Sequence, residues 1–247
     1  MWKLLFLGMV ALVLQAGSVR VAAAANVSYA IGELVRAFEQ MYPDIRMQIT
    51  LGGTGKLVTQ IRHGAPYDLL MAADMAYPQA LYRDGLAVAL PRVYARGALA
   101  LLGTKELDLA AGLRRLTDPA IQTIAIANPK TAPYGKASFE ALKNAGLLER
   151  LAPKFVYGES ISQTVAHTVN AADIGLVSKS ALFSPQMKQY REGREWVTVE
   201  TQLYDPIDQG IVILTSAKNS AGAKAWYDFM LSAKAGRILQ HYGYTLP

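Results

Sequence analysis

The sequence contains no cysteine among its 247 residues. This absence excludes disulfide bonds, thiolate nucleophiles, cysteine zinc sites and iron–sulfur clusters, and it removes the lipidated cysteine of a bacterial lipoprotein. The three histidines, His63, His167 and His241, are far apart, which argues against a histidine metal site. The formal net charge is +6, but no basic cluster is interleaved with aromatic residues, so we expect no nucleic-acid partner.

Motifs of common enzymes are also missing. The sequence has no G-x-S-x-G or H-E-x-x-H motif, and no G-x-G-x-x-G follows an expected strand. Residues 52–57 begin like a phosphate loop, but Thr50 takes the place of its first glycine and Leu57 stands where a magnesium-binding Ser or Thr is needed. A secreted hydrolase that uses Ser178 with Lys179 is a remote alternative. Adjacent residues on a strand point to opposite faces, so these two side chains cannot act together. We therefore expect no enzyme activity and no cofactor.

The first sixteen residues have the layout of a secretory signal peptide. Lys3 gives a positive start, residues 4–14 form an uninterrupted apolar run, and residues 15–18 are small or polar. The run is too short to cross a bilayer, which needs about 20 apolar residues. We expect a signal peptide over residues 1–16, cleavage after Ala16, and a mature protein in the periplasm.

Strand and helix patterns alternate along the mature chain. Apolar runs with period two predict strands, and apolar residues at helical spacing predict helices. We expect strands near 19–23, 46–51, 67–73, 97–102, 121–127, 154–157, 174–178 and 211–215, and helices near 31–41, 56–63, 78–83, 160–170 and 223–240. Repeated strand-then-helix units predict an α/β fold in which helices cover parallel sheets. No loose linker is visible, so any two lobes are joined by strands.

Four of the expected turns, at 23–28, 53–55, 133–135 and 160–163, lead from a strand or loop into a helix. Helix N-termini present unpaired N–H groups and about half a positive charge each. Several of them aimed at one point would bind an anion without any charged side chain. In the fourth turn, Ser160 and Gln163 match the S-x-x-Q capping box, which leaves the Ile161 N–H free. Taken singly, each turn is ordinary helix capping.

The same stretches carry a family resemblance. They read AAAANVS at 22–28, GTGKL at 53–57, GAPYDLLMAAD at 64–74, NP and PYG within 128–135, IGLV at 174–177 and YGY at 242–244. Their order and spacing resemble the periplasmic molybdate-binding proteins of ABC importers across essentially the whole mature chain. The stretch at 64–74 is the most specific single piece.

The resemblance implies a two-lobed type II periplasmic binding-protein fold of the α/β class. Each lobe would be a mixed, mostly parallel sheet flanked by helices, and two crossing strands near 93–97 and 204–209 would form the hinge. Lobe I is expected to comprise residues 17–94 and 206–247, and lobe II residues 95–205. A monomer is expected from the family alone.

The resemblance also implies a site built of neutral donors. Carried over by position, the site would comprise the Asn26 turn, Thr54, Tyr134 and Ile161, with Ala25 and Ser178 as further candidates. Thr54 would contribute its hydroxyl and backbone, and Ile161 its backbone N–H. Many members place a tyrosine where this chain has Ser178, and we expect Tyr134 to replace that phenol. Ser178 then either reaches the ligand through water or is an ordinary strand end.

The implied ligand is molybdate or tungstate, captured between the lobes and passed to an inner-membrane ABC permease. A site lined only by donors disfavours a protonated oxyanion such as phosphate, because its O–H would meet no acceptor. Sulfate is fully ionised like molybdate, so only cavity size would reject it. Sulfate or phosphate binding by the same fold remains the alternative function.

Overall fold

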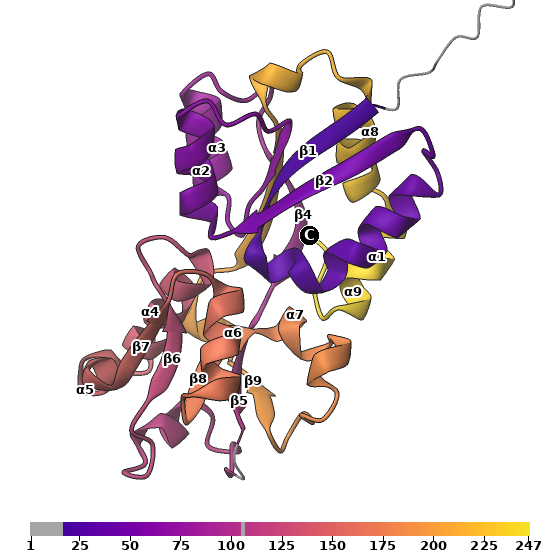
Figure 1. Cartoon of the computed structure of the whole chain (residues 1–247). Helices are drawn as coiled ribbons and strands as arrows, with labels where there is room; N and C mark the ends of the chain where they lie inside the picture. Colours follow the sequence, from indigo (N-terminus) through magenta and orange to yellow (C-terminus); the bar gives the residue numbers. More distant parts are fainter. Residues whose placement is uncertain (1–16, 105–106) are drawn as a thin grey trace, which may run out of the picture.

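The computed structural model describes residues 17–104 and 107–247, which form two lobes, each built on one five-stranded sheet (Figure 1). The expected signal peptide, residues 1–16, lies outside the described residues. In spatial order, the sheet of the first lobe holds β2 (Ile45–Gly52), β1 (Gly17–Ala24), β3 (Leu69–Met71), β10 (Ile207–Ile213) and β4 (Arg92–Gly97). That of the second lobe holds β7 (Phe155–Gly158), β6 (Ile124–Ala127), β8 (Ile174–Ser178), β5 (Leu99–Gly103) and β9 (Trp196–Thr198).

The two sheets share one pairing pattern. In the first lobe β1 pairs in parallel with β2 and β3, and β10 pairs antiparallel with β3 and β4. In the second lobe β6 pairs in parallel with β7 and β8, and β5 pairs antiparallel with β8 and β9. The sheets are therefore mixed, as expected, but parallel pairings are not the majority. The reason is that β10 and β5 each enter from the other lobe and run against both neighbours.

Helices cover both faces of each sheet. The helices of the first lobe are α1 (Ser28–Glu39), α2 (Thr54–Arg62), α3 (Ala76–Arg83), α8 (Ala221–Met230) and α9 (Ala233–His241). Those of the second are α4 (Pro133–Asn144), α5 (Leu148–Leu151), α6 (Ile161–Asn170) and α7 (Lys179–Leu182). Under α1, α8 and α9 lies an aromatic core in which Phe38 contacts Trp226 and Phe229 edge-on. No helix within the described ranges combines the length and apolar character that crossing a membrane requires.

The helix predicted at 223–240 is wrong in extent. The apolar pattern at 223–240 indicated a single long helix, but α8 ends at Met230 and α9 begins at Ala233. Ser232 breaks the helix, because its hydroxyl accepts a hydrogen bond from the Ala235 N–H (3.3 Å) and so caps a new start. The apolar face continues across the break, which is why the spacing alone did not reveal it.

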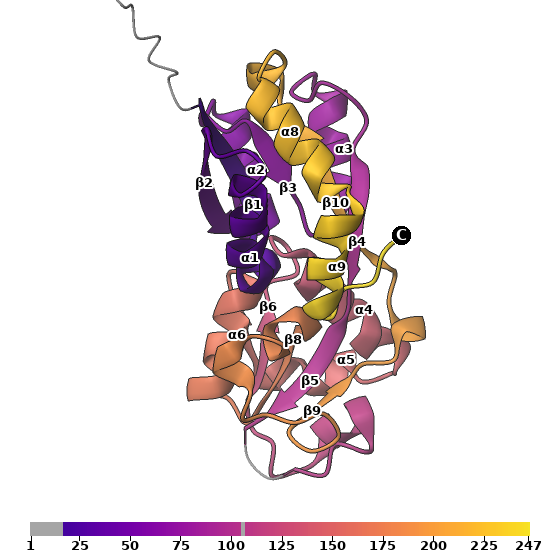
Figure 2. The same cartoon turned by 90° about the vertical axis from the view of Figure 1, so that its right-hand side faces the viewer.

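Two connections join the lobes. The first runs from β4 to β5 with only Ala98 between them, and the second returns from Tyr204 into β10. Figure 2 shows the β4–β5 connection passing from one lobe to the other. These segments agree with the crossing strands expected near 93–97 and 204–209. The lobe boundaries at 94/95 and 205/206 stay a prediction, and β4 belongs to the first sheet along its whole length.

Candidate functional site

The four predicted turns meet between the lobes. Each follows the carboxyl end of a strand: β1 and β2 in the first lobe, β6 and β7 in the second. Together they line a cavity of about 10 Å³, the room of about one water molecule. Its lining residues are Ala24, Ala25, Asn26, Gly52, Gly53, Thr54, Ala73, Ala132, Pro133, Tyr134 and Ile161. None of these lining residues carries a charge, so any anion held here meets only neutral groups.

Thr54 opens helix α2 and is buried at the cavity. Its hydroxyl oxygen accepts a hydrogen bond from the Ala73 N–H (3.2 Å). A hydroxyl that accepts in this way keeps its own O–H to donate. The preceding Gly53 allows the second lobe to come close, because a Cβ there would lie 2.9 Å from the Glu159 carbonyl oxygen. The sequence G-T-G therefore supplies both a donor and the space for closure.

Asn26 is fully buried, and protein groups occupy its side-chain nitrogen. The Nδ2 group donates to Gln209 Oε1 and to the Tyr244 hydroxyl, both at 2.8 Å. Its Oδ1 atom is buried without a hydrogen-bond partner among residues 17–104 and 107–247. The side chain thus keeps one acceptor atom without a partner in the described chain, and the donor that the Asn26 turn can provide is a backbone N–H at the start of a short 3-10 helix (Ala25–Val27).

Tyr134 is the second residue of α4, and its phenol is buried with no hydrogen-bond partner among the described residues. Burial raises the pKa of this phenol well above its usual value; Tyr244 raises it further, and the Asn26 side chain lowers it in part. The hydroxyl therefore stays protonated at neutral pH and can donate. Gly97 makes room for it, because a Cβ on Gly97 would overlap the Tyr134 hydroxyl.

Ile161 is the first residue of α6 and is buried at the cavity. The predicted cap is confirmed on one side, since the Ser160 hydroxyl accepts from the Gln163 N–H (3.3 Å). The return bond differs from the capping box: Gln163 Oε1 accepts from the Glu159 N–H (2.8 Å) instead of that of Ser160. The first N–H groups of a helix have no intrahelical acceptor, so Ile161 offers a backbone donor as expected.

Ser178 is placed differently from the other predicted site residues. It ends β8, is fully buried, and its hydroxyl has no partner within the described chain. It is not among the residues that line the cavity, whereas Ala25 is. A contact between Ser178 and a ligand stays a prediction, as do the ligand contacts of Ala25, Asn26, Thr54 and the second-lobe residues.

Two serine hydroxyls of the second lobe donate hydrogen bonds to backbone carbonyls of the first turn. Ser162 donates to the Ala25 carbonyl (2.8 Å) and Ser180 to the Asn26 carbonyl (3.1 Å). A backbone bond from the Gly55 N–H to the Thr131 carbonyl (3.1 Å) also joins the lobes. The structure is therefore a closed form. Sequence reasoning missed the two serines because nothing local marks a residue that acts across a cleft.

Comparison with known proteins identifies the family. The sequence profile of the bacterial extracellular solute-binding proteins matches residues 19–245. The chain belongs to this family.

Named relatives of this solute-binding protein cover nearly its whole length. It is 36% identical over 243 residues to the molybdate-binding protein ModA of Azotobacter vinelandii, covering 97% of this chain and 94% of the relative. It is 34% identical to ModA of Rhodobacter capsulatus, with 93% and 89% covered. The solved periplasmic molybdate-binding protein of Azotobacter vinelandii superposes with a TM-score of 0.85 at 29% identity, over 93% of this chain and 99% of that one.

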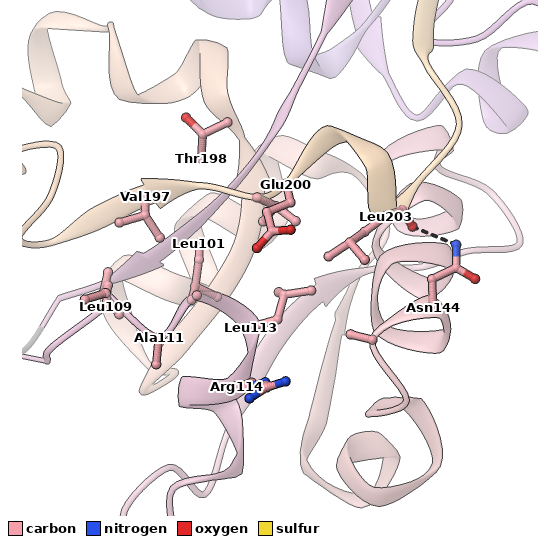
Figure 3. Close-up of a pocket in the computed structure, with 14 residues that line it drawn as sticks. Leu101, Leu109, Ala111, Leu113, Arg114, Asn144, Val197, Thr198, Glu200 and Leu203 are labelled. Carbon is pink, nitrogen blue, oxygen red and sulfur yellow. Dashed lines mark hydrogen bonds between the residues drawn. The ribbon is translucent and has the colours of Figure 1, made fainter.

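This solute-binding protein has a second, larger cavity away from the turns. It lies in the second lobe, measures about 470 Å³, and is lined by Leu101, Leu113 and Val197, with Arg114, Asn144 and Glu200 among its polar residues (Figure 3). The Asn144 side chain donates to the Leu203 carbonyl (2.9 Å). None of the predicted site residues lines it, and its cationic Arg114 makes it a useful control in anion-binding experiments.

Proposed function

We propose that this solute-binding protein captures molybdate between its two lobes and delivers it to the permease of an ABC importer, with tungstate as a second ligand. The observation that carries the proposal is the uncharged, buried cavity where four turns from both lobes meet. The relatives named molybdate-binding protein, which are alike along nearly the full chain, support the same ligand.

Neutral donors are sufficient for a dianion. The site offers the Thr54 and Tyr134 hydroxyls and backbone N–H groups at Ile161 and the other turns. A hydrogen bond to a charged group contributes about 1.5–3 kcal/mol net. Six or seven such bonds offset the cost of taking the ion out of water. Closure of the lobes then stabilises the ligand-bound state, because the second-lobe donors are in place only in the closed form.

The site of action follows from the same proposal. An importer's binding protein works outside the cytoplasm, and we propose the periplasm, reached through a signal peptide cleaved after Ala16. We further propose that the mature protein acts as a monomer that binds and releases without chemical conversion of its ligand.

One observation favours a second candidate ligand. The buried, unpaired Asn26 Oδ1 could accept a hydrogen bond from a protonated oxyanion such as hydrogen phosphate. Phosphate is disfavoured only by a site that has no acceptor, and Asn26 Oδ1 is an acceptor. Phosphate therefore belongs in the binding test beside sulfate.

Isothermal titration of the mature protein, from Gly17 onward, tests the proposal. The protein is first unfolded and refolded to remove copurified ions, and is then titrated separately with molybdate, tungstate, sulfate and phosphate. We expect one-to-one, sub-micromolar binding of molybdate and tungstate and no heat from the other two. Binding of phosphate alone would support the second candidate. Arg114→Ala is the control, and any loss of binding in that variant would move the site to the larger cavity.

A further inference from the structure

The Asn26 side chain is held by two segments that are remote from it in sequence. Gln209 lies on β10, just after the chain returns from the second lobe, and Tyr244 lies in the segment that follows α9. Their contacts with Asn26 span 183 and 218 positions. Asn26 and Gln209 are fully buried and Tyr244 is 3% exposed. The contacts are therefore shielded from water, and hydrogen bonds orient side chains most strongly in such a buried environment.

The direction of each bond in this group has one solution. Gln209 Nε2 donates to the Ile207 carbonyl (2.9 Å), so Gln209 turns its Oε1 toward Asn26 and can only accept there. The Tyr244 hydroxyl donates its single proton to the Asn26 carbonyl (3.0 Å), so its oxygen accepts from Nδ2. Turning the Asn26 amide over would place Oδ1 against Gln209 Oε1, two acceptors without a proton between them.

The hydrogen-bonded residues Asn26, Gln209 and Tyr244 border the Tyr134 phenol. A Cβ on Gly97 would overlap the Tyr134 hydroxyl and lie 3.2 Å from Gln209 Nε2, which places these groups around one small space. Asn26 is near enough to the phenol to influence its pKa. The Asn26 amide that Gln209 and Tyr244 orient is therefore a neighbour of the Tyr134 phenol.

We propose that Gln209 and Tyr244 are positioning residues of the oxyanion site, which act through Asn26. They hold the side-chain nitrogen by two hydrogen bonds, leave Oδ1 without a partner among the described residues, and so set the geometry of the Asn26 turn. Neither residue needs to touch the ligand. This inference rests on the proposed function, because the effect is read through anion binding.

Stopped-flow fluorescence with molybdate tests the inference on the mature protein. We expect Gln209→Leu and Tyr244→Phe each to raise Kd about tenfold, the worth of one buried hydrogen bond. The change should lie mainly in the dissociation rate, as affinity changes among variants of one binding site usually do. Tyr242→Phe is the matched control: this nearby phenol is associated with Glu33 instead of Asn26, and its loss should leave Kd within twofold of wild type.

A double-mutant cycle separates positioning from a general structural role. If Gln209 acts through Asn26, then Gln209→Leu should change Kd less than twofold in an Asn26→Ala background. An undiminished effect in that background, or a Kd within twofold of wild type for both single variants, overturns the inference. Should Gln209→Leu fail to fold, the comparison of Tyr244→Phe with Tyr242→Phe decides. Absence of molybdate binding in the wild type would instead refute the proposed function.

Discussion

The two lobes have the same strand order and pairing, yet they hold their site groups by different means. In the first lobe, protein groups bind the polar side chains: Asn26 is held by Gln209 and Tyr244, and Thr54 by the Ala73 N–H. In the second lobe the starts of two helices do the positioning, through Pro133 at the start of α4 and the Ser160 cap of α6. The Tyr134 phenol there has no protein partner among the described residues.

This difference suggests a division of labour. The first lobe is a prearranged half-site, because most of its contacts lie within that lobe and exist before closure. On the proposed function, the second lobe brings a donor, the Tyr134 hydroxyl, whose partner would be the ligand. Substitutions in the two lobes should therefore separate stability from affinity, and four predictions test this, from the largest effect to the smallest.

The largest effect is expected where the second lobe depends on backbone packing. In Gly135→Ala, the new Cβ would overlap the Ala127 carbonyl at the end of β6. We expect a loss of about 3 kcal/mol in the free energy of unfolding, at the upper end for overpacking. Urea denaturation measures it. Gly32→Ala is the control, because Gly32 is exposed within α1 and the change there should stabilise by up to about 1 kcal/mol.

Tyr134→Phe should separate binding from stability. The variant removes a hydroxyl that has no hydrogen-bond partner in the part of the chain that the structure describes, so the temperature of thermal unfolding without ligand should be unchanged or slightly raised. Molybdate affinity should fall about 10- to 150-fold, the equivalent of about 1.5–3 kcal/mol for a hydrogen bond to a charged group. Thr54→Ala should lower both quantities, since it also leaves the Ala73 N–H unpaired. Equal behaviour of the two variants would remove the proposed distinction between the lobes.

The serines that bridge the lobes should affect release. Ser162→Ala and Ser180→Ala each remove one hydrogen bond to a backbone carbonyl of the first turn, worth about 1 kcal/mol or roughly fivefold in the dissociation rate of molybdate. Association should not change. Ser184→Ala is a matched control, because that buried hydroxyl has no partner in the described chain. A similar change in the control would show that the two serines have no special part in closure.

Near neutral pH the buried phenols have the smallest effect, because their contribution to stability changes only at high pH. Burial raises the pKa of Tyr94 and Tyr134 well above 10 and also raises that of Tyr244. Above pH 10 the unfolded chain loses these protons first, so the free energy of unfolding should fall by about 1.4 kcal/mol per pH unit for each phenol. Below pH 10 the contribution is fully present. Tyr94→Phe should reduce this slope by about 1.4 kcal/mol per pH unit, the contribution of one phenol, and should leave molybdate binding unchanged.

Much of this architecture was readable from sequence because its signals are local. The alternation of strands and helices, the G-T-G turn before Thr54 and the Ser160 cap depend on residues within one turn of each other, and the structure places them as expected. The orientation of Asn26 was not readable, because Gln209 and Tyr244 act on it from 183 and 218 positions away. The break at Ser232 was missed since the apolar spacing continued through it.

The two interlobe connections are paired with each other, since Gly97 faces Ile207 and Arg96 forms an ion pair with Asp208 at 2.6 Å. Mechanically they make a narrow two-stranded strap. Such a strap bends easily across its thin direction and resists sliding in the plane of its hydrogen bonds. The lobes should therefore swing apart along a single arc, and each return along that arc brings the same four turns into register.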